Sequence, residues 1–527
     1  MSKQKSTKYK DKEVDFFVEM VDKGYSITKA CQITCDKFGI TYTDSVRRVF
    51  SDILKRVKGE KKVEKEQIEE LDSFLKARKR KINKKKKTFL ITWAQNSTPV
   101  HKNFFGNLIA YSKHLNAELL IIAGRYKNPT SVFVDAKSED WVDEVKPYLD
   151  ANRHKIHRHL ELLSDIKISP TASTPLSGLN GVTGLESCII GHPRQHLKSL
   201  PVLEGYPNKL LLSSGACTLS NYTDSKAGKK GEFHHTLGFI IVELDGDYYH
   251  IRQVSADDKG NFYDLFTKII DQNVVKNDEG AEAVILGDLH LRNHDKKSTK
   301  SIFKLLDDFK PKHTLLHDIF DGESINHHET KDPFRLMEKE EKGLDILEDE
   351  INYMMEWLRS KINYNLVIVR GNHEDFLDRW LSSADWRKEK NKKAYLKYAN
   401  IKASGEASKG IIPYLIDKEF KGKIKTLSLD DSYRVLGWEL GIHGHLGASG
   451  GRASHTQFKN LNTKNITAHG HHPHKEDGHI SVGTLTKLRL GYNKGMSNWM
   501  HSNCILYPNG KAQLIHFVNG KYFRDQK

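Results

Sequence analysis

The chain has 527 residues, of which 38% are hydrophobic and 29% are charged, and its net charge is +16. This length predicts two to four domains, each able to bury a core. No apolar run approaches the roughly 18–20 residues that span a bilayer, the first residues are charged rather than apolar, and five cysteines are too few for a disulfide framework. We therefore expect a cytoplasmic protein that does not bind a membrane.

The first 58 residues have the spacing of short amphipathic helices. Residues 11–58 place apolar side chains at helical intervals, and Gly24 and Gly39 mark two turns. Three short helices in this order resemble a helix-turn-helix module, whose third helix would present Arg47 and Arg48 to nucleic acid. A small helical bundle used for packing or assembly fits the same pattern equally well, and both interpretations stay open.

Residues 59–87 form a densely charged segment that we expect to be a long helix or linker. Residues 1–87 hold 25 Lys and Arg against 14 Asp and Glu, which accounts for most of the net charge of +16. Such a run is usually a solvated helix, but a dense basic cluster also attracts phosphates, and binding of this kind weakens steeply with salt. The segment therefore predicts an arm that faces nucleic acid, through Lys79, Arg80, Lys84 and Lys85.

Residues 88–275 are expected to form an α/β domain. Strand, helix and strand patterns follow one another at 88–93, 104–115 and 119–123, which is the opening of a β-α-β unit. Later apolar stretches in this region have the pattern of antiparallel strands. No motif here indicates a chemistry, so holding a substrate and building an oligomer both stay open as roles.

Residues 276–527 contain five short motifs rich in Asp, Asn and His. Short apolar runs precede most of them, which is typical of buried parallel strands whose carboxyl-end loops carry ligands. Hard divalent ions bind carboxylate oxygens, and Mn, Fe and Zn also accept imidazole. Two ions about 3.5–4 Å apart that share one carboxylate can clamp a phosphoryl group. The motifs are Asp288-Leu289-His290, Asp318 with Asp321, Gly371-Asn372-His373-Glu374, His443-Gly444-His445 and Gly470-His471-His472-Pro473-His474.

The order of these motifs resembles that of the calcineurin-like metallophosphoesterase family, whose pattern runs D-x-H, G-D-x-x-D, G-N-H-D/E, H and G-H-x-H. The resemblance covers residues 281–510. It implies a β-sandwich flanked by helices within residues 276–527. The whole chain is then expected to be α/β, with this sandwich preceded by an α/β domain and by a small helical, helix-turn-helix-like domain.

The resemblance also implies a metal-binding role for matching residues. Asp288 and His290 would bind the first metal ion, and Asp318 would bridge both ions. Asn372 and His443 would bind the second ion.

Two further side chains take catalytic roles from the resemblance. His373 would stabilise the charge of the scissile phosphate and assist the leaving oxygen, while Asp321 would support the ligands without binding an ion.

Beside the fourth motif, a glycine-rich loop at 447–451 is followed by Arg452. A flexible, basic loop at this place would follow a nucleic-acid backbone toward the metals.

Two positions depart from the family pattern. His317 stands where the family has a Gly before the bridging Asp, so the turn there must accept a side chain. The last motif contains three histidines: His471 follows the Gly as expected, and its partner would be His474 after a one-residue shift. His472 with His474 restores the expected spacing another way, and the register stays open.

The family chemistry implies a hydrolase with two divalent metal ions. Mn2+ is the first choice because a mixed carboxylate, amide and imidazole set suits it, with Mg2+, Fe2+ or Zn2+ as alternatives. Protein phosphatases of the family carry an Arg after the final Asp of the second motif, whereas Gly322 follows Asp321 here. The basic arm instead favours DNA as the partner and a nuclease similar in chemistry to the Mre11 and SbcD group. The layout also resembles metallophosphoesterase proteins of large tailed phages, some linked to DNA degradation, which would place the protein in the host cytoplasm.

Two other functions stay open. A small-molecule nucleotide phosphodiesterase would keep its activity without residues 1–87 and would be insensitive to salt. A non-enzymatic DNA-binding or assembly protein would carry a decayed metal site. A homo-oligomer is compatible with all three functions.

Overall fold

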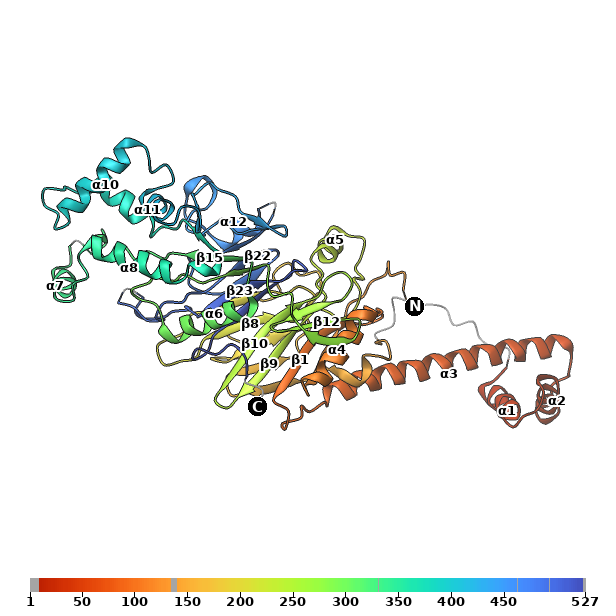
Figure 1. The fold of residues 1–527 in the computed structure, drawn as a ribbon. Coiled ribbons are helices and arrows are strands. Elements are labelled where there is room, and N and C mark those ends of the chain that lie inside the picture. The colour runs from red at the N-terminus through yellow and green to blue at the C-terminus, as the bar shows by residue number, and fades with distance from the viewer. Residues whose placement is uncertain (1–8, 134–139, 330, 462, 492, 525–527) are drawn as a thin grey trace. The chain divides into compact units, whose positions relative to one another are not determined.

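The computed structural model describes residues 9–133, 140–329, 331–461, 463–491 and 493–524, and the side chains of residues 59–72 lie outside this description. The chain is mixed α/β and divides into two compact units, Met1–Lys76 and Ala77–Lys527 (Figure 1). No helix in the described ranges combines the length and the apolar character that crossing a membrane requires.

The first unit is a small helical bundle. Its helices are α1 (Asp11–Asp22), α2 (Ile27–Phe38) and the start of α3 (Asp44–Arg78). Thr43 begins α3, because its hydroxyl accepts a hydrogen bond from the Val46 N–H at 3.2 Å. Phe17, Phe50, Cys31 and Cys35 are fully buried between the helices, so the helical interpretation of residues 11–58 is confirmed.

The expected boundary between the third short helix and the charged segment is wrong. Residues 44–78 form one continuous helix, and this helix ends at Arg78 rather than continuing toward residue 87. Just past its end, Arg80 donates hydrogen bonds to the carbonyl oxygens of Pro147 at 2.9 Å and Leu149 at 3.4 Å. Arg80 and these partners all belong to the second unit.

The strands of the second unit form four sheets within the described residues. The five-stranded sheet has the order β10-β9-β1-β2-β3, and the six-stranded sheet has the order β17-β16-β15-β14-β23-β24. The ten-stranded sheet has the order β18-β19-β20-β22-β21-β7-β8-β6-β5-β4, and a small sheet has the order β11-β12-β13. The strands are β1 (Thr88–Gln95), β2 (Glu118–Gly124), β3 (Leu149–Asp150), β4 (Arg153–His157), β5 (Leu160–Leu163), β6 (Ser187–Ile190), β7 (Leu197–Leu200), β8 (Lys209–Ser213), β9 (Gly238–Asp245), β10 (Tyr248–Ser255), β11 (Phe262–Asp264), β12 (Thr267–Ile270), β13 (Asn273–Lys276), β14 (Ala283–Ile285), β15 (His313–His317), β16 (Leu366–Val369), β17 (Lys425–Leu427), β18 (Arg434–Val435), β19 (Trp438–Glu439), β20 (Lys464–Thr467), β21 (His474–Glu476), β22 (His479–Ser481), β23 (Ser502–Leu506) and β24 (Ala512–His516).

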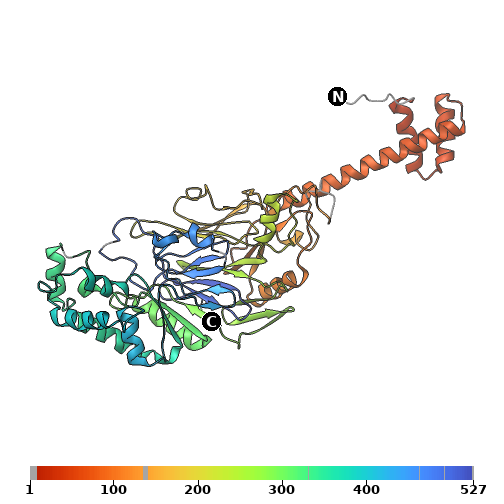
Figure 2. The ribbon, with the colours of Figure 1, turned by 90° about the horizontal axis from the view of Figure 1, so that it is seen from above.

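Helices pack beside these sheets, and Figures 1 and 2 show α7 to α11 gathered together at one side of the second unit. The expected strand, helix and strand at the start of residues 88–275 are confirmed as β1, α4 and β2, with β1 and β2 parallel. The α-helices of this unit are α4 (Lys102–His114), α5 (Lys226–Phe233), α6 (Lys296–Phe309), α7 (Pro333–Glu341), α8 (Leu347–Ser360), α9 (Asp375–Ser383), α10 (Lys392–Ser404), α11 (Ile411–Phe420) and α12 (His455–Lys459). Short 3-10 turns lie at Lys146–Tyr148, Glu323–Ile325, Ile362–Tyr364 and Ala448–Gly450.

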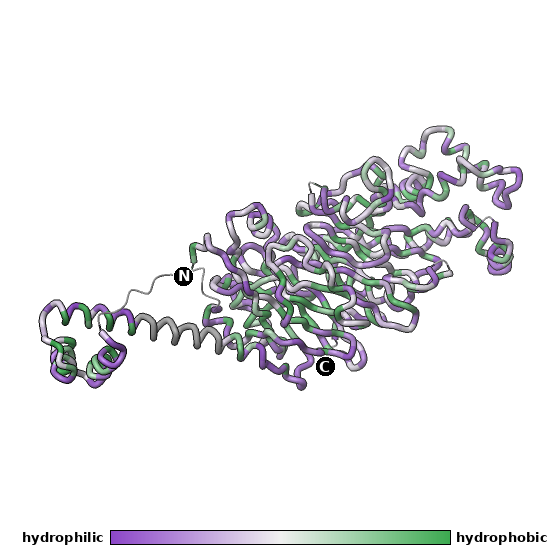
Figure 3. Tube along the Cα trace, turned by 180° about the vertical axis from the view of Figure 1, so that it is seen from behind, coloured by the Kyte–Doolittle hydropathy of each residue, from purple (hydrophilic) through white to green (hydrophobic). Residues whose placement is uncertain are grey.

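Alternate residues of the six-stranded sheet enter two different cores. Ala283 and Ile285 of β14 join a core shared with the ten- and five-stranded sheets, whereas Val284 and Leu286 face a core that contains α6, α8 and α9. Successive side chains of a strand point to opposite faces, so the sheet is covered on both sides. Figure 3 shows the apolar segments of the strands inside this unit.

The ten-stranded sheet crosses the boundary that we expected between residues 275 and 276. In this sheet β21 pairs antiparallel with β7, so strands from residues 88–275 and 276–527 form one hydrogen-bonded ladder. Next to this pairing, the Asp477 carboxylate accepts hydrogen bonds from Arg194 at 3.1 Å and from His196 at 3.0 Å. The two expected regions are therefore joined by both backbone pairing and a buried charged contact.

Candidate metal centre

The loops at the carboxyl ends of strands from two sheets meet at one place. Asp288, Asp318 and Asn372 follow the parallel strands β14, β15 and β16 of the six-stranded sheet. His443 follows β19 and His471 follows β20 in the ten-stranded sheet. Because parallel strands end at the same edge, motifs that lie far apart in the sequence are brought together here.

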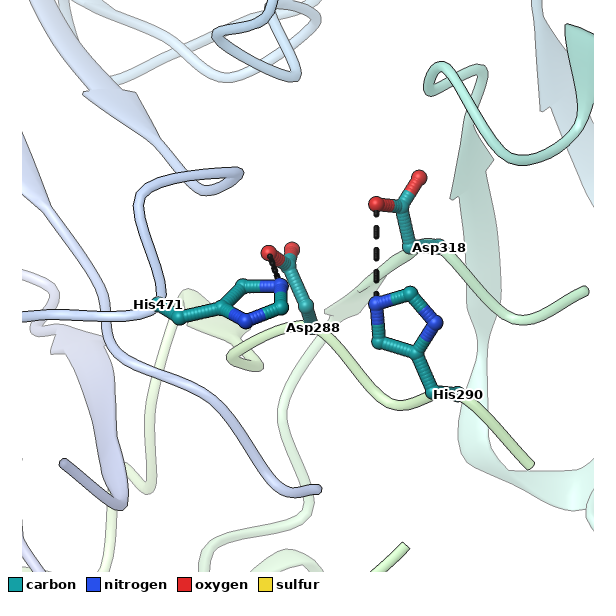
Figure 4. A group of neighbouring side chains, drawn as sticks. All are labelled: Asp288, His290, Asp318 and His471. Atoms are coloured by element: carbon teal, nitrogen blue, oxygen red, sulfur yellow. Dashed lines mark ion pairs between the residues drawn. The ribbon is translucent and has the colours of Figure 1, made fainter. Parts of the chain in front are cut away.

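Four buried side chains form the first metal-capable group, namely Asp288, His290, Asp318 and His471. Each offers one ligand atom, and these atoms lie within 4.8 Å of one another. His471 Nε2 lies 2.9 Å from Asp288 Oδ2, and His290 Nε2 lies 3.8 Å from Asp318 Oδ2, as drawn in Figure 4.

A second group consists of Asp318, His443 and His469. His443 Nε2 lies 3.2 Å from Asp318 Oδ2 and 3.1 Å from the side-chain oxygen of Asn372. Asp318 belongs to both groups, so one carboxylate lies between two sets of donors.

Burial dominates the electrostatics of the centre. It raises the pKa of Asp318 well above its usual range, and the nearby Asp288 adds to the effect. At Asp288 burial acts in the same direction, but contact with His471 outweighs it and lowers the pKa. Burial also lowers the pKa of His290 and His443 well below the ordinary value. Both imidazoles are therefore neutral and offer a lone pair, while a cation would offset the repulsion between the carboxylates.

The buried atoms of the centre without a hydrogen-bond partner include His290 Nε2, Asp318 Oδ1 and His471 Nδ1. Buried polar atoms are normally paired, and an unpaired one costs about 1–3 kcal/mol. Carboxylate oxygens and imidazole nitrogens are ligands that Mn, Fe and Zn accept. The residues of this cluster therefore fit a bound metal ion.

Glu374 holds two of the ligand-bearing loops in place. Its carboxylate accepts hydrogen bonds from the N–H groups of Ile319 at 2.9 Å and Gly371 at 2.8 Å. A Cβ atom at Gly371 would lie 2.0 Å from Asp318 Oδ1, so the Asp318 carboxylate requires glycine at this position. The sequence gives Glu374 as part of the third motif, but its contact with the Asp318 loop could only be seen in the fold.

The backbone is strained where the ligands are presented. Asp318 has a φ of 44° and His290 a φ of 45°, both in the left-handed region. Such conformations cost about 1–3 kcal/mol each and persist where the surroundings enforce them.

His317, which stands in place of the expected Gly, is the buried last residue of β15, and its Nδ1 lies 3.4 Å from Nδ1 of His443.

His373 lies beside the first group with one nitrogen already engaged. Its Nδ1–H donates to the backbone oxygen of Asp321 at 2.8 Å, which leaves Nε2 as the nitrogen available to a substrate. The ring packs against His290 with ring centroids 4.3 Å apart and stacks on Phe376. Burial lowers the pKa of His373 to about 4.

Asp321 supports the loop that follows His290. Its carboxylate accepts hydrogen bonds from the Arg292 N–H at 2.7 Å and from the Asn293 amide at 3.0 Å. Burial, assisted by the charge of Glu350, raises the pKa of Asp321 to about 7.

The histidines of the last motif take different positions in the structure. His469 and His471 enter the metal-capable groups, whereas His472 and His474 belong to neither. His472 instead donates from Nδ1 to the backbone oxygen of Gly470 at 2.6 Å. The spacing His469-Gly470-His471 carries the signal that sequence reasoning missed, because Ala468 precedes it where the family pattern has Gly.

The basic residues expected to contact nucleic acid differ in their exposure and in their contacts within the protein. Arg48, Lys79, Lys84, Lys85 and Arg452 are exposed. Arg47 is partly buried and pairs with Asp44 at 3.3 Å. Arg80 is partly buried, and its guanidinium contacts backbone oxygens and lies 3.6 Å from Glu118, so its nucleic-acid contact stays a prediction.

Comparisons with known proteins bear on the chain as a whole. No family model matches it, and no solved structure matches it. It is 30% identical over 469 residues to "Protein A1" of Escherichia phage T5, and this alignment covers 84% of the chain and 83% of that protein.

The fold and the site define a mixed α/β protein with a buried Asp/His cluster that can hold a metal ion. The extent of the similarity then identifies its relatives. The chain belongs to the family of protein A1 of phage T5.

Proposed function

We propose that this protein is a metal-dependent phosphodiesterase of the calcineurin-like metallophosphoesterase type that cleaves DNA. The observation that carries the proposal is the place of Asp318, which is shared by two metal-capable groups. A carboxylate shared between two ions is the arrangement used for in-line phosphoryl chemistry. The motif order and the ends of strands β14, β15, β16, β19 and β20 support the same assignment.

The two donor groups fit two divalent ions, with Mn2+ as the first choice. One group is Asp288, His290, Asp318 and His471, and the other is Asp318, His443 and His469 with the Asn372 oxygen. When bound, such ions neutralise phosphate oxygens and lower the pKa of a water molecule toward neutrality.

His373 acts next to these donors. The hydrogen bond from its Nδ1–H to the Asp321 carbonyl fixes the ring, so Nε2 is the atom that meets the phosphate. In the neutral ring Nε2 carries a lone pair; a bound phosphate anion would favour uptake of a proton from solvent there, and the imidazolium would then pass this proton to the leaving oxygen. Asp321 in turn fixes the loop of His290 through Arg292 and Asn293. Glu374 keeps Asp318 and Asn372 at a constant separation by binding both of their loops.

Charge supports DNA as the substrate. Residues 1–87 hold 25 Lys and Arg against 14 Asp and Glu, and a segment with this excess of positive charge attracts the phosphate backbone without sequence preference. Arg452 is exposed. Its charge helps to lower the pKa of His469 in the second donor group, although burial and neighbouring side chains affect this pKa more strongly. A phosphate backbone approaching the centre would therefore meet positive charge.

The test is hydrolysis of plasmid and linear DNA with Mn2+. We expect cleavage by the wild type, and its loss in Asp318→Asn and in His373→Ala. Asp247→Asn and His114→Ala are matched controls, because both residues are exposed and lie outside the centre. Mn2+ binding, measured separately, should fall in Asp318→Asn and persist in His373→Ala.

Other results would point to the other functions. Intact DNA together with hydrolysis of bis(p-nitrophenyl) phosphate would indicate a small-molecule phosphodiesterase. No hydrolysis of either substrate, with DNA still bound, would indicate a DNA-binding or assembly protein and would refute the proposal.

A further inference from the structure

A second group of histidines lies outside the centre described above. We call it the His455 cluster: it consists of His455 at the start of α12, His472 in the loop after β20, His474 and Glu476 on β21, and His479 on β22. The His455 ring stacks on the His474 ring with centroids 4.0 Å apart, and it contacts the rings of His472 and His479 at 5.3 Å and 5.2 Å.

Hydrogen bonding defines which nitrogen of His472 carries a proton. Its Nδ1 lies 2.6 Å from the backbone oxygen of Gly470, and an oxygen of this kind can only accept. Nδ1 is therefore protonated, and Nε2 of the neutral ring carries a lone pair.

The same reasoning applies to His479, which is fully buried. Its Nδ1 lies 2.7 Å from Oδ1 of Asn465. The Asn465 amide nitrogen donates to the carbonyl oxygens of Phe458 and Thr463, which confirms that Oδ1 is the acceptor. Nδ1 of His479 is therefore protonated as well, and its Nε2 carries a lone pair.

Both lone pairs face His455. Its Nε2 lies 3.2 Å from Nε2 of His472, and its Nδ1 lies 3.0 Å from Nε2 of His479. A neutral imidazole has one N–H, so His455 can donate to only one of these neighbours. At the other contact two lone pairs face each other, which is repulsive unless a cation lies there.

A metal ion at this contact would remove the repulsion, because it accepts both lone pairs at once.

We propose that the His455 cluster is a further metal site that binds one Zn2+ ion or a similar divalent ion. It is separate from the centre formed by the two metal-capable groups around Asp288 and Asp318, which we call the Asp288 centre. At a tetrahedral ion with metal–nitrogen bonds of about 2.0–2.1 Å, two ligand nitrogens are separated by roughly 3.3 Å. His455 Nε2 and His472 Nε2 already have this spacing. His472 also donates its other N–H to a carbonyl, as metal-bound histidines usually do.

His474 and Glu476 are the further donors nearest to this pair, and the His474 ring would have to turn out of its stack on His455 to reach the ion. His474 Nε2 is buried with no hydrogen-bond partner and lies 3.4 Å from Oε2 of Glu476. The other oxygen of Glu476 accepts a hydrogen bond from Lys459 of α12 at 2.6 Å. The donors of this cluster lie further apart than those of the Asp288 centre, so the ion would draw them together.

The ion would tie three segments to one another: α12, the loop after β20, and the β21–β22 hairpin. The loop after β20 also carries His469 and His471. The site therefore has a structural role, which is to hold the ligand-bearing loop, and it does not depend on the reaction proposed above.

The experiment counts metal ions in the full-length protein. Chelated protein is reloaded with Zn2+, dialysed and measured by inductively coupled plasma mass spectrometry. Asp318→Asn, which disrupts the Asp288 centre, should still hold one tight ion per chain, and adding His455→Asn to it should remove that ion. His114→Ala, an exposed histidine outside the cluster, is the matched control.

A second measurement keeps the proposal testable if His455→Asn does not fold. In Asp318→Asn alone, Co2+ should give the visible absorption of a tetrahedral site, and chelation should lower the melting temperature. No tight ion and no such absorption in Asp318→Asn would overturn the proposal, as would an unchanged ion count after His455→Asn in a folded protein.

Discussion

Substitution of Gly371 by alanine probes how closely the Asp318 carboxylate is held. The added Cβ would lie 2.0 Å from Asp318 Oδ1 and 3.0 Å from Oε2 of Glu374. To reach an ordinary contact of 3.4 Å, the Asp318 oxygen must move by about 1.4 Å. The backbone at Gly371 is not in the left-handed region, so the substitution tests space alone.

A displacement of this size should disable the centre while leaving the fold intact. A misplacement of about 1 Å can cost about a hundredfold in rate, and we expect Mn2+ affinity and phosphodiester hydrolysis to fall by at least that factor in Gly371→Ala. Overpacking should lower stability by about 1–3 kcal/mol. Calorimetric Mn2+ titration, hydrolysis of bis(p-nitrophenyl) phosphate and thermal unfolding measure these three quantities.

Gly181→Ala is the matched control, because a Cβ there meets nothing within 4 Å. It should behave as the wild type in all three measurements. Wild-type Mn2+ affinity in Gly371→Ala would refute the reasoning, since it would show that the Asp318 oxygen does not need its present position to bind the ion.

Three further substitutions test other parts of the chain. Arg48→Gln should weaken DNA binding and reduce the slope of log affinity against log salt concentration by about one. Fluorescence anisotropy across a salt series measures this slope, and an unchanged slope would show that DNA does not contact Arg48. Arg80→Ala should instead lower stability by about 1–3 kcal/mol through its lost carbonyl contacts, with the salt slope unchanged; a reduced slope would show that DNA contacts Arg80. Burial favours a raised pKa at Asp264, but Arg252, with its Nε 2.6 Å away, outweighs it and lowers the pKa. Because its pKa is lower in the folded state, the Asp264 carboxylate contributes stability above about pH 4, and this contribution is lost as the pH falls through the folded-state pKa. Asp264→Asn should therefore lower the free energy of unfolding by about 3–5 kcal/mol at pH 7, and this free energy, measured in urea, should fall less steeply with decreasing pH than in the wild type. An equally steep fall in the variant would assign the acid sensitivity to other carboxyl groups.

The sequence was informative where a local pattern and its structural cause coincide. Apolar runs before Asp288, Asp318 and Asn372 predicted buried parallel strands, and β14, β15 and β16 pair in parallel and are buried on both faces. The helical periods in residues 11–58 were equally direct, since Phe17 and Phe50 meet in one core.

What escaped prediction depends on contacts between distant residues. Several histidines between residues 469 and 474 had similar local context, and only the path of the loop after β20 separates His469 and His471 from His472 and His474. Arg80 looked like one more residue of a basic run, but its partners Pro147 and Leu149 come nearly 70 positions later.

The pairing of β7 with β21 bears on how such a gene can evolve. A recombination event between codons 275 and 276 would part these strands and leave the unpaired N–H and C=O groups of both exposed, which invites aggregation. It would also leave Arg194 without Asp477, a buried charge that a foreign partner would not match. Exchange between related genes at this point is therefore disfavoured, and the two halves should be inherited together.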